Sequence, residues 1–356
     1  AAKRAVDAHG TICYGSRFMN GTLNLHEELE DRLAEFAGTE SAVVFTTGYQ
    51  SNLGAISALL DRDTHIISDK LNHASIMDGI FLAGGMNKHV ELHRYKHNNM
   101  DDLKRILSRI PDDHSRLIVT DGVFSMEGDV VRLPELMNVA RAYGARVYLD
   151  EAHAIGVVGA TGRGTAEHWS NLAGRAEDAG NSQAESSGPD VQNADLVMCT
   201  FSKSFGSIGG FVAGDDAVID YISHHARPLI FSASMPPAQL GAALEALKIM
   251  TAEPWRPARL QEIARKMITG FTELGFNVGT AETPIVPLII GDNDKTFLFW
   301  KSLYERGVYV NPVISPAVPP NRALLRTNYM AIHSDEDLDW ILQVAGEEGR
   351  KLGIVG

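Results

Sequence analysis

The chain has few cysteines, no long apolar run and a shortage of basic residues. Its two cysteines, Cys13 and Cys199, lack the spacing of metal ligands, so we expect neither a disulfide framework nor a metal site. This cysteine usage favours a reducing compartment, and we expect a cytoplasmic protein. Without about 18 consecutive apolar residues, the sequence predicts no transmembrane helix. The net charge of -13 argues against a nucleic-acid partner.

The start of the chain carries no signal-peptide pattern. The first ten residues, AAKRAVDAHG, resemble the end of a helix, which suggests that an N-terminal segment is missing. With 44% hydrophobic and 22% charged residues, the composition is that of an ordinary globular protein. At 356 residues the chain is long enough for a large two-lobed unit.

Short apolar runs alternate with helical patterns in the first two thirds of the chain. Helices are predicted at 49–60 and 133–143. Continuous apolar strands separated by helices predict an α/β fold. We expect a mostly parallel sheet of about seven strands, with helices packed on both of its faces. The predicted strands are 41–46, 65–68, 116–120, 146–149, 195–198 and 210–213.

The pattern changes after a long helix that begins at Pro236-Pro237 and runs to about residue 250. Beyond it we expect helices at 260–274, 297–306 and 336–352, with strands at 285–290 and 324–327. The sequence therefore predicts a large α/β domain over 1–237 and a smaller α+β domain over 238–356. Residues 170–194 are rich in small and acidic residues, and we expect a surface insertion or mobile loop there.

Polar residues follow several predicted strands at the point where each one ends. They are Thr47-Gly48-Tyr49, His73, Ser125, Asp150 and Lys203. Each alone has an ordinary explanation as a helix cap, a turn, a structural histidine or a surface lysine. Because the carboxyl ends of parallel strands meet at one edge of a sheet, where ligands bind, we expect them to form one site.

Lys203 lies in the stretch CTFSKSFGSIGG and allows two chemical interpretations. A phosphate-binding P-loop is excluded because no glycine precedes the lysine at the required spacing. The other is a Schiff base, since a partly desolvated lysine becomes a usable nucleophile. Pyridoxal 5'-phosphate (PLP) needs a carboxylate at its ring nitrogen, donors for its phosphate and a flat group over its ring. Asp150, the Thr47-Gly48-Tyr49 turn with Ser202, and His73 could supply these in that order.

Eight blocks of sequence resemble the α-oxoamine synthases, PLP-dependent enzymes of fold type I, and the resemblance covers essentially the whole chain. The first block, GSRFMNGT, and the stretch VNPVISPAVP resemble bacterial serine palmitoyltransferases most. Ile314 stands where other bacterial members have an arginine. The eight blocks are Gly15–Thr22, Phe45–Tyr49, Asn72–Ser75, Asp121–Asp129, Asp150–His153, Thr200–Lys203, Phe231–Pro237 and Leu325–Thr327.

The resemblance implies a role for each candidate residue. Lys203 is expected to hold PLP as a Schiff base and later to move the Cα proton, Asp150 to pair with the ring nitrogen, and His73 to stack on the ring. Arg326 is expected to bind the substrate carboxylate, with Asn20 as a second substrate-binding residue. Ser232 is expected to reach the phosphate in the neighbouring subunit of a homodimer. The remaining cofactor-binding residues implied are Gly48, Tyr49, Ser125, His153, Thr200 and Ser202.

The reaction implied is a decarboxylating condensation of an amino acid with an acyl thioester. The resemblance favours serine and a long-chain acyl-CoA as substrates, the first step of sphingolipid-type synthesis. The 170–194 insertion and the abrupt start would also suit a synthase module that uses alanine or glycine and a carrier-protein thioester. Other fold type I reactions and a non-catalytic subunit are the remaining alternatives, and the retained Lys203, Asp150 and His73 disfavour the latter. Because a long-chain product is apolar, peripheral contact with a membrane stays open.

Overall fold

The computed structural model describes residues 1–85, 90–178 and 194–356. The described chain divides into two compact units. The first contains Ala1–Val123 and Val131–Pro254, and the second contains Phe124–Val130 and Trp255–Gly356. The sequence prediction placed the domain boundary at residue 237, whereas the division lies near Pro254 and a short segment, Phe124–Val130, joins the second unit.

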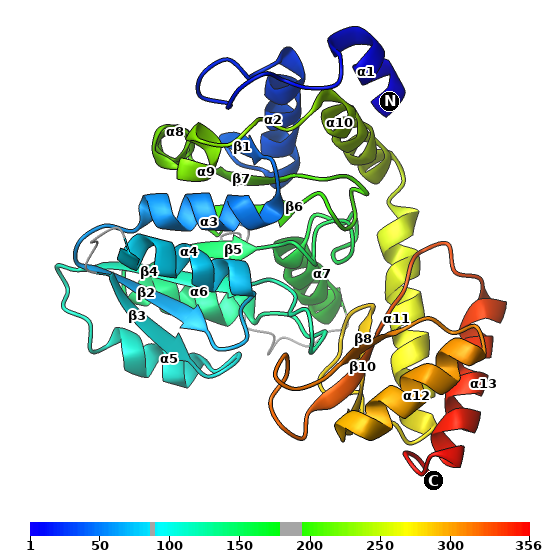
Figure 1. The fold of residues 1–356 in the computed structure, drawn as a ribbon. Coiled ribbons are helices and arrows are strands. Elements are labelled where there is room, and N and C mark those ends of the chain that lie inside the picture. Colours follow the sequence, from blue (N-terminus) through cyan, green and yellow to red (C-terminus); the bar gives the residue numbers. More distant parts are fainter. Residues whose placement is uncertain (86–89, 179–193) are drawn as a thin grey trace. The chain divides into compact units, whose positions relative to one another are not determined.

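The first unit is built on a seven-stranded sheet in the order β1-β7-β6-β5-β4-β2-β3 (Figure 1). Every pairing that involves β7 is antiparallel, and the other pairings are parallel. The predicted α/β class and mostly parallel sheet are confirmed. The strands are β1 (Ser41–Phe45), β2 (Thr64–Asp69), β3 (Val90–Tyr95), β4 (Ser115–Asp121), β5 (Arg146–Asp150), β6 (Leu196–Thr200) and β7 (Gly210–Gly214).

Alternation along the strands divides the core of this unit between the two faces of the sheet. On β7, Val212 packs into one apolar cluster, whereas Phe211 and Ala213 pack into the other. The first cluster includes residues of α3 (Gly48–Leu59), α4 (Ala74–Gly85) and α8 (Asp216–His225), and the second includes residues of α2 (Asn24–Ala37) and α10 (Pro237–Ala252). Continuous apolar strands follow from this two-sided burial. The remaining helices are α1 (Ala2–His9), α5 (Met100–Leu107), α6 (Leu133–Ala142), α7 (Thr165–Asp178) and α9 (Arg227–Ile230).

Three features of this unit differ from the sequence predictions. Helix α10 packs on α1 and α2 through Leu240, Ala243 and Leu247, so it belongs with the large unit and not with the C-terminal domain. Residues 170–178 continue α7 and are not a loop, while 179–193 lie outside the described residues. Strand β3 was missed because its sequence, VELHRY, is polar and only Tyr95 is buried in it.

The second unit pairs β8 (Ile285–Gly291), β10 (Ala323–Asn328) and β9 (Asn311–Val313) in a three-stranded antiparallel sheet. Its helices are α11 (Trp255–Glu273), α12 (Asn293–Glu305) and α13 (Asp335–Lys351), which contribute side chains to a single apolar cluster with the sheet. The predicted α+β character of this part agrees with that arrangement. Among the described residues of both units, no helix has the length and apolarity needed to span a membrane.

Candidate active site

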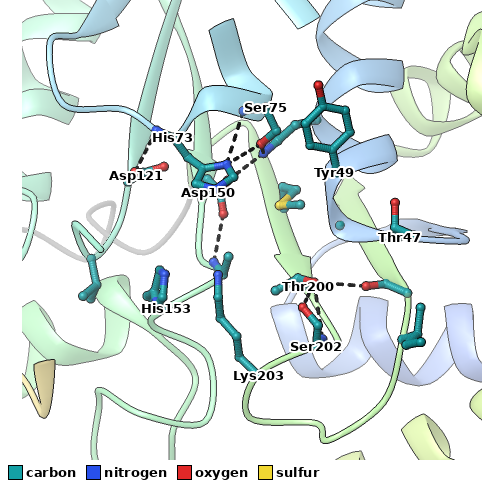
Figure 2. A pocket seen from close by; sticks show the side chains of 17 residues that line it. Thr47, Tyr49, His73, Ser75, Asp121, Asp150, His153, Thr200, Ser202 and Lys203 are labelled. Atoms are coloured by element: carbon teal, nitrogen blue, oxygen red, sulfur yellow. Dashed lines mark hydrogen bonds between the residues drawn. The ribbon is translucent and has the colours of Figure 1, made fainter. Parts of the chain in front are cut away.

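A pocket of about 390 Å³ lies in the first unit, lined by residues that follow β1, β2, β4, β5 and β6. The parallel strands all end at this edge of the sheet. Strand β7 begins here, because it runs in the opposite direction and pairs Gly210 with both Phe45 and Thr200. Eight of the predicted site residues line the pocket: Gly48, Tyr49, His73, Asp150, His153, Thr200, Ser202 and Lys203. Figure 2 shows their side chains around the hollow.

One end of the pocket is formed by the start of α3 and the end of β6. Thr47 is the N-cap of α3, and its hydroxyl accepts the backbone N–H of Gln50 at 3.1 Å. The N–H groups of Gly48 and Tyr49 precede the first hydrogen bond of the helix, in which Ser51 donates to the Thr47 carbonyl. These N–H groups have no acceptor within the helix, so this end of the pocket is suited to an anion.

The approach of α3 to β6 explains why residue 48 is a glycine. A Cβ at this position would lie 2.4 Å from Thr200 Oγ1 and 2.5 Å from Thr200 Cβ. The Thr200 hydroxyl also lies 2.9 Å from the Ser202 hydroxyl and donates to the Gly209 carbonyl. Two hydroxyl groups and the bare helix terminus thus face the same small volume, as recognition of a phosphate by hydrogen bonds requires.

Asp150 is a buried carboxylate in the wall of the pocket, with only 4% of its surface exposed. The Asn52 amide donates to its Oδ2 at 2.7 Å, and the Ala152 N–H donates to its Oδ1 at 2.9 Å. The second Asn52 N–H donates to the Ser75 hydroxyl, and the Asn52 carbonyl oxygen accepts the Tyr148 hydroxyl. Every polar atom of the Asn52 side chain is therefore used, and the position of the Asp150 carboxylate is fixed.

Asp121 is a second buried carboxyl group in the same wall. Burial, and next the negative charge of Asp150, raise the pKa of Asp121 well above its usual value. Its Oδ2 accepts one N–H, that of His73, at 3.1 Å. Asp121 therefore favours its protonated form at pH values where an exposed aspartate is ionised.

The His73 side chain is oriented by Ser75. Its Nδ1 lies 2.7 Å from the Ser75 hydroxyl, and the Ser75 backbone N–H also points at Nδ1 from 3.3 Å. Because the Ser75 oxygen already accepts from Asn52, its hydrogen can be donated to His73. Nδ1 is then the acceptor, and the ring carries its proton on Nε2.

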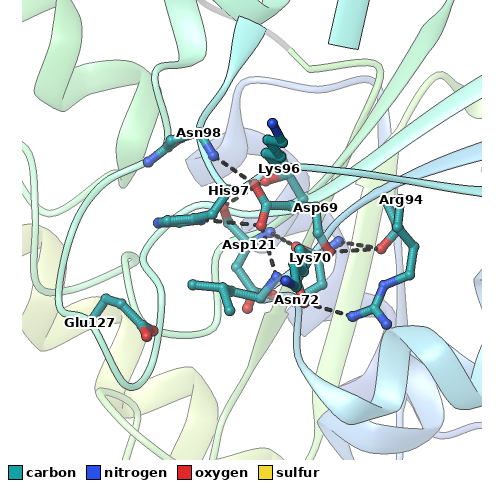
Figure 3. Close-up of polar contacts among 12 residues, drawn as sticks. Asp69, Lys70, Asn72, Arg94, Lys96, His97, Asn98, Asp121 and Glu127 are labelled. Carbon is teal, nitrogen blue, oxygen red and sulfur yellow. Dashed lines mark hydrogen bonds and ion pairs between the residues drawn. The ribbon is translucent and has the colours of Figure 1, made fainter. Parts of the chain in front are cut away.

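Figure 3 shows a set of polar contacts around Asp69 and Asn72, at the end of β2 and in the turn that leads to His73. The buried Asp69 accepts backbone N–H groups from Leu71 and Asn98, and its carboxylate lies 3.1 Å from His97 Nδ1. Asn72 donates to the Ser68 hydroxyl and the Val119 carbonyl, and it accepts the Asp121 N–H. These bonds hold the turn that precedes α4 and therefore set the position of His73.

The other four predicted residues do not line this pocket. Ser125 and Arg326 belong to the second unit, where Nε of Arg326 donates to the Ser125 carbonyl and burial lowers the pKa of Arg326. Asn20 is exposed on the first unit. The Ser232 hydroxyl accepts from Nε2 of Gln50 at 3.3 Å within the same chain. The roles expected for these four residues remain predictions.

Three polar pocket residues were given no role from the sequence, namely Asn52, Ser75 and Asp121. Ser75 and Asp121 lie inside blocks that carried the family resemblance, so their positions were noticed but not their contacts. Asn52 could have been suspected because it follows Gly48 by one helical turn and therefore lies on the same side of the helix. Its partners come from two other segments, α4 and β5, and sequence spacing does not reveal them.

The residues present fit PLP. The pocket combines a lysine, a buried carboxylate, a histidine and an anion-binding helix terminus whose glycine a Cβ would obstruct. A carboxylate for the ring nitrogen, donors for a phosphate and an amine for a Schiff base are the groups that this cofactor requires. PLP alone accounts for this combination of lysine, carboxylate, histidine and helix terminus.

Comparison with known proteins agrees with this fit. Residues 9–344 match the family described as aminotransferase class I and II. The chain is 45% identical to serine palmitoyltransferase of Sphingobacterium spiritivorum over 339 residues, which are 95% of this chain and 79% of that protein. It is 39% identical to 8-amino-7-oxononanoate synthase of Thermoanaerobacter pseudethanolicus over 356 residues, covering 100% of this chain and 84% of that protein. A solved structure of serine palmitoyltransferase with PLP superposes with a TM-score of 0.89 at 34% identity, covering 99% of this chain and 83% of that chain.

The chain belongs to the aminotransferase class I and II family, with the fold of type I PLP-dependent transferases. Within that family it is an α-oxoamine synthase, a PLP-dependent acyltransferase that condenses an amino acid with an acyl thioester and releases carbon dioxide. The expected family, enzyme class and cofactor are thereby confirmed.

Proposed function

We propose that the chain condenses L-serine with a long-chain acyl-CoA, as the first step of sphingolipid-type synthesis. The observation that carries the proposal is the pocket at one sheet edge that contains Lys203, Asp150 and His73. The 45% identity to a serine palmitoyltransferase supports serine and a long acyl chain. Similarity to an 8-amino-7-oxononanoate synthase at 39% identity makes another amino acid the principal competing substrate.

The buried polar groups suit the activation of an amino acid. Bound PLP forms a Schiff base with an amine and withdraws electrons from the attached carbon. Asp150, fixed by Asn52 and the Ala152 N–H, is the group that would pair with the ring nitrogen and keep it protonated. His73, held by Ser75 with its proton on Nε2, would lie against the ring. His153 lies in the same wall and would contact the ring hydroxyl.

Lys203 is the base in this proposal. Figure 2 shows its side chain extending into the pocket toward the region of Asp150. As a free amine, its Nζ would take the proton from the substrate Cα. The hydroxyls of Thr200 and Ser202, with the N–H groups of Gly48 and Tyr49, would hold the phosphate during this transfer.

Arg326 is the residue proposed to bind the substrate carboxylate, a task that suits the two parallel N–H groups of a guanidinium. Its Nε donates to the Ser125 carbonyl within the second unit. Asn20 of the first unit is the other residue proposed to bind substrate.

A homodimer would complete the site. Several large apolar side chains are exposed on the first unit, including Tyr14 at 80%, Met19 at 75% and Phe231 at 73%. Exposed apolar groups of this size favour a partner surface. Ser232 directly follows Phe231, so a second copy that covers this segment would bring Ser232 to its neighbour's phosphate.

The experiment is a panel of amino acids crossed with acyl-CoA chain lengths, with free thiol measured continuously and products identified by mass. We expect release of thiol only when both substrates are present, with the highest kcat/KM for serine and a long acyl chain. A higher kcat/KM for alanine or glycine would overturn the choice of serine. Thiol release only from acyl carrier protein would overturn the choice of donor. Lys203→Ala is the matched inactive control, and it must also lose the Schiff-base absorbance.

A further inference from the structure

A group of histidines lies at the outer edge of the large sheet. His65 is the second residue of β2, Glu91 and His93 belong to β3, and His114 immediately precedes β4. Among the described strands, β3 is an edge strand of the sheet and pairs with β2 alone (Figure 1). The parallel register places His65 opposite Glu91 and Ile67 opposite His93. Because side chains two residues apart lie on the same face, His65, Glu91 and His93 all project from one face.

The distances between the ligand atoms suit one metal ion. His65 Nδ1 lies 2.9 Å from His93 Nε2 and 3.5 Å from Glu91 Oε2, and the last two atoms are 3.9 Å apart. Ligands at about 2.0–2.1 Å from a tetrahedral Zn²⁺ lie roughly 3.3–3.4 Å from one another. Shifts of a few tenths of an ångström would therefore seat an ion between the three atoms. The Glu91 side chain is 68% exposed and can rotate to make them.

His114 would orient the central ligand. Its Nδ1 lies 2.8 Å from His65 Nε2. When His65 carries its proton on Nε2 and donates it to His114, the Nδ1 lone pair points toward His93 and Glu91. Metal-binding histidines typically donate their second N–H in this way, which fixes the tautomer and strengthens the ligand.

The charged neighbours of the group are Glu91 and Arg116. Arg116 lies opposite His65 in the register of β2 and β4, so its positive charge would repel a bound metal ion if it pointed toward the site. Its guanidinium is directed at other acceptors, donating to the carbonyls of Tyr143, Ile110 and Pro111 and to the Asp112 carboxylate. The carboxylate of Glu91 supplies the compensating negative charge beside the two imidazoles.

We propose that His65, Glu91 and His93 form a structural binding site for a divalent transition-metal ion such as Zn²⁺. Imidazole nitrogens with one carboxylate suit zinc and its neighbours better than magnesium or calcium. The ion fastens edge strand β3 to β2. This link would add to the pairing of β3 with β2, in a strand of which only Tyr95 is buried. The site lies about 13 Å along β2 from the end of the strand that leads to the pocket, so the ion takes no part in the condensation.

The test uses the tag-free PLP-bound protein, stripped of metal with a chelator and titrated with Zn²⁺ in a calorimeter. We expect one saturable site per chain and a rise in Tm with Zn²⁺. His93→Ala removes a ligand and should abolish both, and Glu91→Gln should weaken binding. His114→Ala should lower the affinity by about 10–100-fold, as expected for a group that orients a ligand. His9→Ala, which removes an exposed histidine on α1, is the matched control and should bind like the unmodified chain.

Three results would overturn the proposal. If His93→Ala binds Zn²⁺ as tightly as the unmodified chain, or if the unmodified chain shows no saturable binding, the histidines form only a hydrogen-bonded group. If the turnover of the stripped protein falls and is restored by Zn²⁺, the ion is not purely structural. Substitution with Co²⁺ gives an independent readout, since an absorption spectrum of tetrahedral nitrogen and oxygen ligation should appear in the unmodified chain and not in His93→Ala.

Discussion

Asp150 shows how one buried side chain depends on its neighbours. Its carboxylate is held by the Asn52 amide and the Ala152 N–H, and Asn52 is in turn held by Tyr148. The surroundings therefore stabilise an anion at one fixed place in the pocket wall. The proposed chemistry requires this, because only an anionic partner favours the protonated ring nitrogen.

Replacement of that anion tests its role. Asp150→Asn keeps the shape of the side chain but removes the charge, so we expect the cofactor Schiff base to form while kcat falls by about 10²–10³-fold, as when one preorganised electrostatic group is lost. Steady-state thiol release and the cofactor absorbance measure the two effects separately. Asp101→Asn, at a position whose side chain is 95% exposed, is the control. A kcat within twofold of the unmodified chain would remove Asp150 from the proposed mechanism.

Glu151, the next residue, determines part of the pH dependence of stability. Burial raises the pKa of Glu151 to about 7, although Thr165 donates to the carboxylate from its N–H and its hydroxyl. The folded chain therefore holds this proton over a pH range in which the unfolded chain has released it. The contribution of Glu151 to stability is complete below its ordinary pKa of 4.5 and is lost as the pH rises through about 7.

Glu151→Gln removes this titration while keeping a side chain of the same shape. Between pH 4.5 and pH 8 we expect the unmodified chain to lose roughly 3 kcal/mol of unfolding free energy relative to the variant. Urea denaturation of both PLP-bound proteins at the two pH values gives the difference. Glu135→Gln, at an exposed position, should show no such change. A parallel pH dependence in the Glu151→Gln variant and the unmodified chain would contradict the assignment.

At the scale of elements, the start of α3 and the end of β6 together form the anion-binding end of the pocket. The helix contributes N–H groups that have no acceptor within it, and the strand contributes the Thr200 hydroxyl. Gly48 allows the two elements to approach closely because it has no side chain. Gly48→Ala should force α3 away from Thr200 and lower the affinity for PLP, because the added Cβ would lie 2.4 Å from the Thr200 hydroxyl. Fluorescence titration of the apoprotein with PLP measures this. Gly84→Ala in α4, where a Cβ would meet nothing within 4 Å, is the control. Equal affinity in both variants would show that the two elements need not be this close.

At the scale of the whole molecule, we expect a site shared between two subunits to behave differently from a site formed within one subunit. If Lys203 serves its own subunit and Ser232 serves the neighbouring one, a mixed dimer of Lys203→Ala and Ser232→Ala contains one complete site. Co-expressed, differently tagged subunits should therefore regain activity at a PLP concentration too low to support Ser232→Ala alone. Mixing Lys203→Ala with Asp150→Asn, both in the same pocket, should restore none. Equal activity of the two mixtures would contradict a shared site.

The fold was predictable where the pattern of the chain is local. The apolar runs at β1, β2, β4, β5, β6 and β7 and the helices between them followed from periodicity, because burial on both faces requires continuous apolar strands. Strand β3 did not follow, since an edge strand with polar side chains lacks that signal. The position of α10 could not be predicted either, because its apolar residues do not specify which elements they pack against. The structure shows that these elements are α1 and α2.

By itself, the sequence determined which groups lie together: Lys203, Asp150, His73 and the start of α3 all follow strand ends, and parallel strands end at one edge. Only the tertiary structure decided which atoms hold them in place. Asn52 joins Asp150, Ser75 and Tyr148 across up to 98 residues of chain. The histidine group likewise depends on the register of β2 against β3. Such contacts arise from packing between segments distant in the chain, and no local pattern encodes them.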